Sequence, residues 1–222
     1  MKILYGVQGT GNGHISRSRE MAKYLSDSQV EVSYLFSGRA KSELFDMEIF
    51  GDFIHRDGLT FRTERGKIAY WQTLKGNNVF QFCKDVHSLD VAEYDLVITD
   101  FEPVTAWAAR RAKKECLAIG HQYAFGANTP MTGESWIAKK IMQYFAPAEQ
   151  SLGLHWSRYH DNVFPPIVDV TLQRQSTSGP IVVYLPFEDQ QTVTNLLQKF
   201  NHQEFAQYSP ELVSTRVDNV QL

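Results

Sequence analysis

The 222-residue sequence predicts an α/β fold built on a parallel sheet. Short apolar runs recur along the chain, as expected for strands that are covered on both faces. Helix-like segments separate these runs, and a strand–helix–strand order implies a right-handed crossover between parallel strands. With 43% apolar and 21% charged residues, the chain can bury a substantial core.

The first half of the chain opens with a strand, a helix and a second strand. Ile3–Val7 is nearly all apolar, Ile15–Ser26 mixes apolar and charged residues as a helix does, and Val30–Phe36 is again strand-like. The middle is less regular. There the sequence predicts a helix over 40–48, a hairpin from Leu59–Phe61 and Lys67–Tyr70 with Arg65–Gly66 near its turn, and a helix over 71–89.

A clear α/β pattern returns at residue 95. Asp95–Thr99 is a buried strand, and Pro103 fits the first turn of the following helix, where its missing N–H costs nothing. This helix runs to about Lys114. The remaining elements of the expected N-terminal domain are a strand at Cys116–Gly120, a helix over 135–146 and a last strand at Leu152–Trp156.

The composition changes near residue 164. A stiff Phe164–Val168 segment and a polar Gln173–Gly179 segment predict a linker over 164–179, after an N-terminal domain of residues 1–163. Beyond it, residues 180–222 begin a second domain. Its expected elements are a strand at Ile181–Leu185, a helix over about 188–200 and short strands near 204–208 and 217–222. So short a segment predicts an incomplete, apparently truncated second domain.

Composition also limits the classes of function. A formal net charge of −3 argues against a general nucleic-acid binder. Cys83 and Cys116 lie among apolar neighbours, so we expect two buried free thiols, and no ligand spacing predicts a metal site. The chain has no signal-peptide pattern and no apolar window of membrane-helix length, which favours a cytoplasmic location.

The segment Gly9-Thr10-Gly11-Asn12-Gly13-His14 links the first strand to the first helix. Three alternating glycines permit positive φ and let a ligand approach the main-chain N–H groups. The helix that follows points its positive N-terminus at the same place, at the carboxyl edge of the sheet where ligands bind. The sequence therefore predicts substrate-binding residues at Gly9, Thr10, Gly11, Asn12 and Gly13. The alternative is a tight turn without a ligand.

A dinucleotide-binding loop is a rival interpretation of the same residues. Its GxGxxG pattern fails because His14 takes the place of the third glycine, and the second strand ends without an acidic residue. We therefore expect no cofactor. Arg39 could bind the 2′-phosphate of NADP, so an NADP-binding loop stays an alternative.

The glycine loop resembles the first loop of family-28-type GT-B glycosyltransferases, which include the enzyme that adds N-acetylglucosamine to the peptidoglycan lipid precursor. Their usual form is Gly-Thr-Gly-Gly-His, so this chain has one extra residue. A wider set of segments looks like a less characterised bacterial and archaeal group of related glycosyltransferases and covers nearly the whole chain. These segments are Thr99–Pro103, Leu152–Trp156, Pro165–Ile167 and Tyr184–Glu188 together with the loop.

This resemblance implies a GT-B fold, in which an N-terminal Rossmann-like domain holds the acceptor and a C-terminal one grips the nucleotide-sugar. Members of the family are metal-independent. Their donor-binding residues lie mostly in the second domain and would fall after Leu222. The implied activity is transfer of a sugar from a nucleotide-diphosphate donor to a hydroxyl acceptor, a glycan or lipid-linked molecule of the cell envelope.

His14 and Asp100 are the candidate catalytic residues. Glycosyl transfer needs a base for the acceptor hydroxyl, and a histidine titrates in the right range. Asp100 and Glu102 follow a buried strand and could orient His14 or bind acceptor hydroxyls, although Glu102 also suits the N-terminus of the next helix. His121 and Gln122 follow the next strand on the same edge and are candidate substrate-binding residues, or else loop residues.

The helix over 136–145 combines apolar residues with Lys139 and Lys140. A core-facing helix with solvated lysines is the favoured interpretation, and a peripheral contact with the inner face of the membrane is the alternative. Two alternatives to a transferase also stay open: a nucleotide-sugar hydrolase or epimerase on the same fold, or a chain that binds acceptor without turnover.

Overall fold

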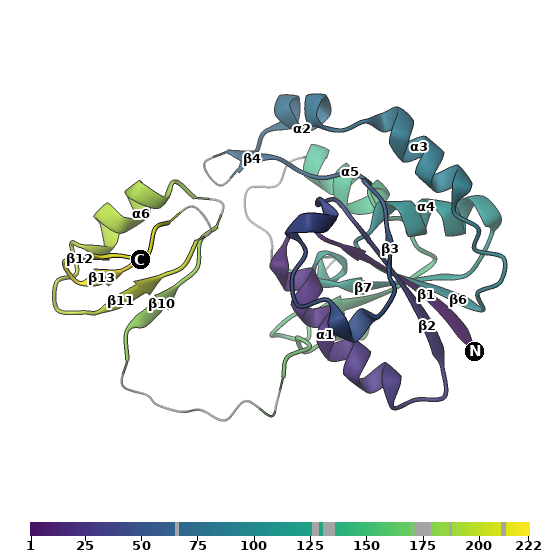
Figure 1. Cartoon of the computed structure of the whole chain (residues 1–222), viewed down its shortest axis with the longest axis horizontal. Helices are drawn as coiled ribbons and strands as arrows, with labels where there is room; N and C mark the ends of the chain where they lie inside the picture. The colour runs from purple at the N-terminus through teal and green to yellow at the C-terminus, as the bar shows by residue number, and fades with distance from the viewer. Residues whose placement is uncertain are drawn as a thin grey trace. The chain divides into compact units, whose positions relative to one another are not determined.

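The computed structural model describes residues 1–64, 67–125, 129–130, 136–169, 171, 179–186, 188–209 and 212–222. They form two compact units (Figure 1). The first comprises Met1–Thr60 and Asn77–Asp169, and the second comprises Phe61–Gly76 and Val170–Leu222. The first unit thus extends past residue 163, and 61–76 groups with the second unit. The predicted turn at Arg65–Gly66 and most of the predicted linker lie outside the described residues.

The first unit contains a seven-stranded sheet of order β3-β2-β1-β6-β7-β8-β9, in which all neighbouring strands pair in parallel. The chain builds one half of the sheet outward from β1 and then returns to start the other half at β6. The order therefore reverses between β1 and β6. The strands are β1 (Lys2–Gln8), β2 (Glu31–Ser37), β3 (Ile54–His55), β6 (Leu96–Asp100), β7 (Cys116–Gly120), β8 (Gln150–Leu154) and β9 (Val163–Phe164).

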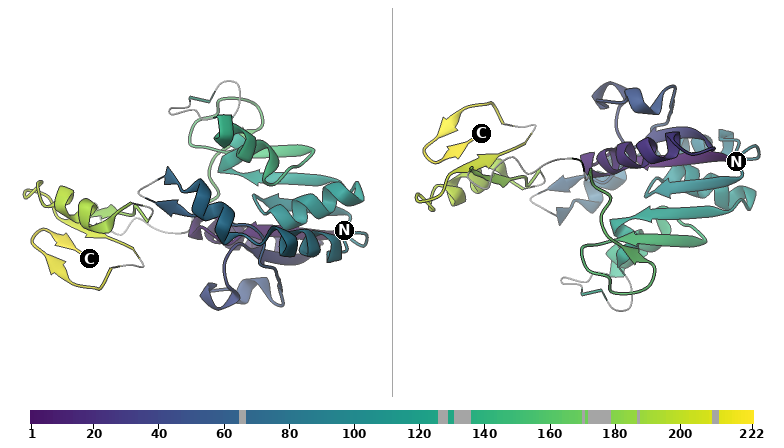
Figure 2. Two further views of the ribbon diagram at one scale, coloured as in Figure 1. Left: turned by 90° about the horizontal axis from the view of Figure 1, so that it is seen from above. Right: turned by 90° about the horizontal axis from the view of Figure 1, so that it is seen from below.

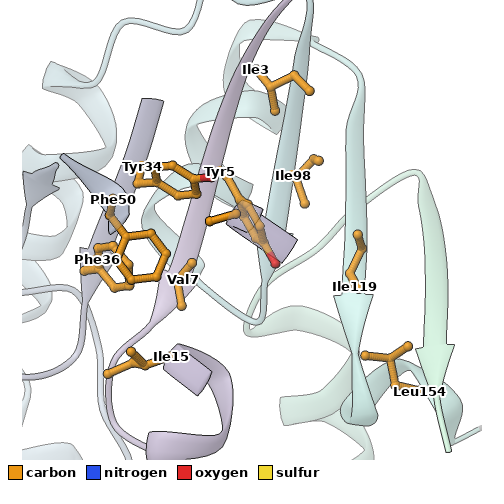
Figure 3. Packing of buried hydrophobic residues seen from close by; sticks show 11 residues of the cluster. Ile3, Tyr5, Val7, Ile15, Tyr34, Phe36, Phe50, Ile98, Ile119 and Leu154 are labelled. Carbon is orange, nitrogen blue, oxygen red and sulfur yellow. The ribbon is translucent and has the colours of Figure 1, made fainter. Parts of the chain in front are cut away.

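Helices cover both faces of this sheet, as the apolar runs predict. Alternate residues of β1 enter different cores: Ile3, Tyr5 and Val7 pack in a cluster with Ile15 of α1 (Asn12–Ser26), as Figure 3 shows. Leu4 packs in a second cluster with α3 (Val79–Ser88) and α4 (Pro103–Ala112). Accordingly, α3 faces the viewer in the view from above and α1 in the view from below (Figure 2).

Two predicted helices differ in the structure. The helix expected over 40–48 is replaced by two 3-10 turns, η1 (Lys41–Glu43) and η2 (Glu48–Phe50). The break lets the Phe50 ring pack against Tyr34 and Phe36, with centroids 4.9 and 4.8 Å apart. The helix expected over 71–89 is two helices, α2 (Tyr70–Gly76) and α3.

The second unit contains an antiparallel hairpin of β4 (Thr63–Glu64) and β5 (Lys67–Ile68) and a four-stranded sheet of order β10-β11-β13-β12. Its small core consists of Val193, Leu197, Phe205 and Val220. The elements are β10 (Ile181–Val183), α6 (Gln190–Leu197), β11 (Phe205–Gln207), β12 (Arg216–Val217) and β13 (Val220–Gln221).

The remaining elements belong to the first unit. They are η3 (His121–Ala124), which follows β7 directly, and α5 (Trp136–Tyr144). Both cysteines are free, but only Cys116 is buried; Cys83 is exposed, which corrects the expectation of two buried thiols. Within the described part of the chain, no helix has both the length and the apolar character to span a membrane.

Candidate functional site

The candidate site lies where β1 and β6 end side by side. Val7 of β1 is in register with Asp100 of β6, and the glycine loop follows β1 directly. In parallel sheets, ligands bind outside the carboxyl ends of the strands at the point where the strand order reverses. The reversal between β1 and β6 is such a point, so the fold brings His14, in the first turn of α1, to Asp100.

His14 is paired with the Asp100 carboxylate. The distance from His14 Nδ1 to Asp100 Oδ1 is 2.7 Å. Because a carboxylate can only accept a hydrogen bond, Nδ1 carries a proton, and in the neutral imidazole Nε2 then carries the lone pair. The His14 side chain retains 15% of its exposure, whereas that of Asp100 is completely buried. The pair therefore offers a basic nitrogen, held in a fixed orientation, next to the glycine loop.

Arg17 completes this group and was missed at the level of the sequence. Its Nε donates to Asp100 Oδ2 at 2.8 Å and its Nη2 donates to Asp100 Oδ1 at 2.5 Å. Burial opposes the charge on Asp100, but His14 and Arg17 outweigh it and hold the pKa of this carboxyl below its ordinary value. Asp100 is therefore ionised at neutral pH. The available signal was the spacing of three residues between His14 and Arg17, which puts both on one face of a helix.

Gln122 reaches the same group from η3. Its Nε2 lies 3.3 Å from His14 Nε2, the nitrogen with the lone pair. Its Oε1 is buried and has no hydrogen-bond partner among the described residues. The amide is thus in contact with the atom of His14 that a substrate hydroxyl would approach. Of the candidate residues, the structure thus brings together His14, Asp100 and Gln122.

The glycine loop is fixed by its neighbours rather than by left-handed backbone. Gly9 N donates to Ser37 O at 2.7 Å, and a Cβ on Gly9 would lie 2.9 Å from that oxygen. None of Gly9, Gly11 and Gly13 has a positive φ, so the loop does not use this freedom of its glycines. Gly11 is the N-cap of α1 and provides no side-chain acceptor, so no side chain caps the helix end that faces the loop.

Arg39 braces the loop. It donates from Nη1 to Asn12 Oδ1 and from Nη2 to the Thr10 carbonyl, each at 2.9 Å. The Thr10 hydroxyl lies 2.8 Å from the Thr60 hydroxyl and also bonds to Gln8. The Arg39 guanidinium is engaged with the loop itself, so the geometry gives no support to the NADP reading.

Phe101 shows where the backbone is strained. It follows Asp100 with a φ of 55°, in the left-handed region that bulky residues avoid. Its ring is buried and packs against Phe145 with centroids 4.9 Å apart. This turn lies between Asp100, which pairs with His14, and Glu102, which is the N-cap of α4.

Glu102 does not join the site. It is completely buried at the N-cap of α4, where its carboxylate accepts from the Val104 and Thr105 backbone N–H groups and from the Ser37 hydroxyl. Burial raises the pKa of this carboxyl, and its hydrogen bonds act in the opposite direction. The structure thus corrects the prediction of substrate binding and makes Glu102 a helix cap.

His121 lies apart from the His14 group. Its Nδ1 is 3.0 Å from the Leu154 carbonyl oxygen, and its ring stacks on His155 with centroids 5.6 Å apart. Phe125 and Tyr159 extend this aromatic cluster. His121 therefore shares the sheet edge with Gln122 but points to different partners. In the described ranges, no group of three His, Cys, Asp or Glu residues could hold a metal ion.

Comparison with known proteins identifies relatives of this fold. A family model described as glycosyl transferase family 1 matches residues 1–212. A search of curated proteins found no match. The family match confirms the predicted enzyme class, whereas the finer likeness to family 28 stays a prediction.

Three solved structures show similar folds at low sequence identity. A Streptomyces sp. SF2575 glycosyltransferase, SsfS6, in complex with thymidine diphosphate, has a TM-score of 0.57 and 9% identity, over 99% of this chain and 70% of that one. The kitacinnamycin glycotransferase has a TM-score of 0.52 and 12% identity, over 99% of this chain and 69% of that one. CalG4, the calicheamicin glycosyltransferase, has a TM-score of 0.51 and 14% identity, over 99% of this chain and 69% of that one. These neighbours and the parallel sheet confirm the predicted α/β fold of GT-B type.

Proposed function

Because the chain belongs to glycosyl transferase family 1, we propose that it moves a sugar from a nucleoside diphosphate to a hydroxyl acceptor, with inversion at the anomeric carbon. The observation that carries this proposal is the His14–Asp100 pair. It combines an ionised, buried carboxylate with an imidazole whose second nitrogen can accept a proton. One base on the acceptor side is what an inverting displacement needs.

In the proposed reaction, the acceptor hydroxyl gives its proton to His14 Nε2 while its oxygen attacks the anomeric carbon. The bond from that carbon to the diphosphate oxygen breaks, and the nucleoside diphosphate leaves with the electron pair. Asp100 accepts a hydrogen bond from His14 Nδ1–H throughout, so it keeps the imidazole oriented and stabilises the imidazolium that forms. Gln122, in contact with Nε2, would help to position the acceptor hydroxyl.

The glycine loop and the start of α1 are proposed to bind oxygens of the acceptor or the diphosphate. No side chain caps the N-terminus of α1, a helix of 15 residues. The proposed binding residues lead into this end and begin the helix: Gly9, Thr10, Gly11, Asn12 and Gly13. Backbone N–H groups and the helix dipole favour negative charge there. A nucleotide-sugar partner is supported by SsfS6, whose structure holds thymidine diphosphate.

The acceptor is proposed to be a glycan or lipid-linked molecule of the cell envelope, met at the cytoplasmic face of the membrane. Support comes from the resemblance of the sequence to enzymes of that kind and from the surface of α5. There, Trp136 is 75% exposed, and Lys139 and Lys140 are exposed as well. A basic helix with exposed aromatic residues suits an anionic lipid surface.

The activity can be tested with labelled UDP- and dTDP-sugars, with and without cell-envelope lipids. The proposal expects labelled product only when an acceptor is present, with release of the nucleoside diphosphate. Release of free sugar without acceptor would indicate a hydrolase, conversion of the donor sugar to its epimer would indicate an epimerase, and lipid binding without turnover would indicate an acceptor-binding protein.

The role of His14 can be tested by His14→Ala. Loss of the general base should lower kcat at least ~10²-fold while the donor still binds. A smaller loss would rule out general-base catalysis by His14. His87 is an exposed histidine whose Nδ1 contacts the Cys83 carbonyl on α3. His87→Ala is therefore a matched control and should retain activity.

A further inference from the structure

Arg17 places a positive charge next to the His14–Asp100 pair, and the proposed reaction gives this charge no role. Arg17 follows His14 by three residues on α1, and its guanidinium grips both oxygens of Asp100 through Nε and Nη2. Its side chain retains only 14% of its exposure. A buried, bidentate arginine on a carboxylate is a strong and directional contact, so this geometry is specific.

The position of this cation has an electrostatic consequence for His14. A carboxylate with no other partner would stabilise a positive imidazolium on His14. Arg17 offsets that effect in two ways: it neutralises the same carboxylate, and its Nη2 lies 3.1 Å from His14 Nδ1. A second positive charge on His14 would therefore form next to an existing one.

The other groups around the pair do not change this balance. Burial, followed by the charge on Asp100, raises the pKa of Tyr5 on β1 and of Tyr123 on η3, so both phenols are neutral. Gln122, which contacts the far side of the imidazole, carries no charge. Among the described groups that face the pair, Arg17 and Asp100 supply the permanent charges.

We infer that Arg17 is a positioning residue that offsets the charge of Asp100 beside His14 and so limits how strongly that carboxylate stabilises a His14 imidazolium. The inference rests on the proposed role of His14 as the base. It explains why an arginine is buried beside a carboxylate that is already hydrogen-bonded to His14. It also assigns Arg17 an effect on the pH dependence, which a purely structural residue would not have.

The test is an NMR titration of labelled histidines, in which His14 is assigned by the signal that His14→Ala removes. Arg17→Gln keeps an N–H donor for Asp100 but removes the charge, so the His14 midpoint should move up by about one pH unit. Arg17→Lys keeps the charge, and its midpoint should stay within about 0.3 unit of the wild type. Arg19→Gln is the matched control on the same helix, since Arg19 bonds to Phe45 and Asp46 carbonyls instead, and it should not move the midpoint.

An unchanged midpoint in Arg17→Gln would overturn the inference. If that variant does not fold, Arg17→Lys still decides, because a full-unit shift with the charge retained would overturn the inference equally. The pH–rate profile separates this question from the proposed function. If the midpoint moves and the acidic limb of kcat/KM moves with it, both proposals hold. If only the midpoint moves, the charge-setting role of Arg17 holds and the base role of His14 fails.

Discussion

At the scale of the residue, Asp100 is the charge around which the site is arranged. It is completely buried and paired with His14 and Arg17. Because its pKa is lowered in the folded protein, it contributes stability that is present above the ordinary aspartate value near ~3.9 and is lost as the pH falls through the lower, folded value. The same charge that orients His14 thus also stabilises the fold.

Asp100→Asn tests this charge. The variant should be less stable than the wild type by about 3 kcal/mol at neutral pH, because Arg17 is left buried without its counter-ion. The difference should stay constant from about pH 8 to 5 and shrink below about pH 4, as the wild-type carboxyl becomes protonated. Urea unfolding at several pH values measures it. A difference that grows towards acid pH would contradict the lowered pKa of Asp100.

The two outer glycines of the loop offer a matched pair of variants. A Cβ on Gly13 would meet nothing within 4 Å, whereas one on Gly9 would lie 2.9 Å from Ser37 O. Gly13→Ala should therefore fold as well as the wild type and even gain up to about 1 kcal/mol, since Gly13 lies in α1. If substrate approaches this backbone, KM should nonetheless rise. An unchanged KM would remove Gly13 from the proposed binding loop.

The same residues show how far the sequence predicts a site. His14, Asp100 and Gln122 could be brought together because the carboxyl ends of parallel strands share one edge. The spacing from His14 was a weak signal for Arg17, since an arginine on a helix is usually solvated and only the pairing with the buried Asp100 turns it inward. Glu102 was misassigned because a carboxylate at the end of a strand suits both a cleft and a helix cap, and only its burial decides.

At the scale of the element, α4 depends on its cap. Glu102 accepts from two N–H groups of the first turn and from the hydroxyls of Ser37 and Thr105. α4 also packs very closely on β1, since a Cβ on Gly6 would lie 2.1 Å from Thr105 Oγ1. Thr105 thus belongs both to the cap and to the close contact between α4 and β1.

Glu102→Ala should lower the free energy of unfolding by about 3 kcal/mol, because it removes a helix cap and leaves buried donors unpaired. Glu102→Gln keeps the shape and one acceptor oxygen and should cost less than half as much. Thermal unfolding of both variants gives the comparison. Because Glu102 lies outside the His14 group, KM should not change in Glu102→Gln; a raised KM with unchanged stability would return Glu102 to the substrate site.

Long apolar elements were predictable from the sequence, and interruptions were not. Cys116–Gly120 is a strand with the predicted bounds, because its apolar residues are buried on both faces. The break between α2 and α3 depends on Asn78, whose side chain caps α3 by accepting from Gln81 N. A single capping residue such as Asn78 is a weak signal against the helical pattern of the residues on both sides of it, so the sequence predicts one continuous helix.

At the scale of the whole molecule, the two units differ in how much core each possesses. In the described residues, the sheet of the first unit is packed between two clusters of eleven buried apolar residues each, whereas the second unit has one cluster of four. The clusters share no residue. Since burial of apolar surface is the main source of stability, the second unit should open at a lower free energy than the first.

Hydrogen exchange measures this difference directly. Amides of β11 should exchange at least ~10²-fold faster than those of β1 and β6 under native conditions, because opening of the second unit does not require the first unit to unfold. Val220→Ala enlarges the gap: it leaves a cavity in the small cluster and should speed exchange in β11 and β13. Exchange in β1 should not change in that variant, since Val220 contributes nothing to the clusters around β1. Equal exchange rates in β1 and β11, or a response of β1 to Val220→Ala, would mean that the units unfold as one.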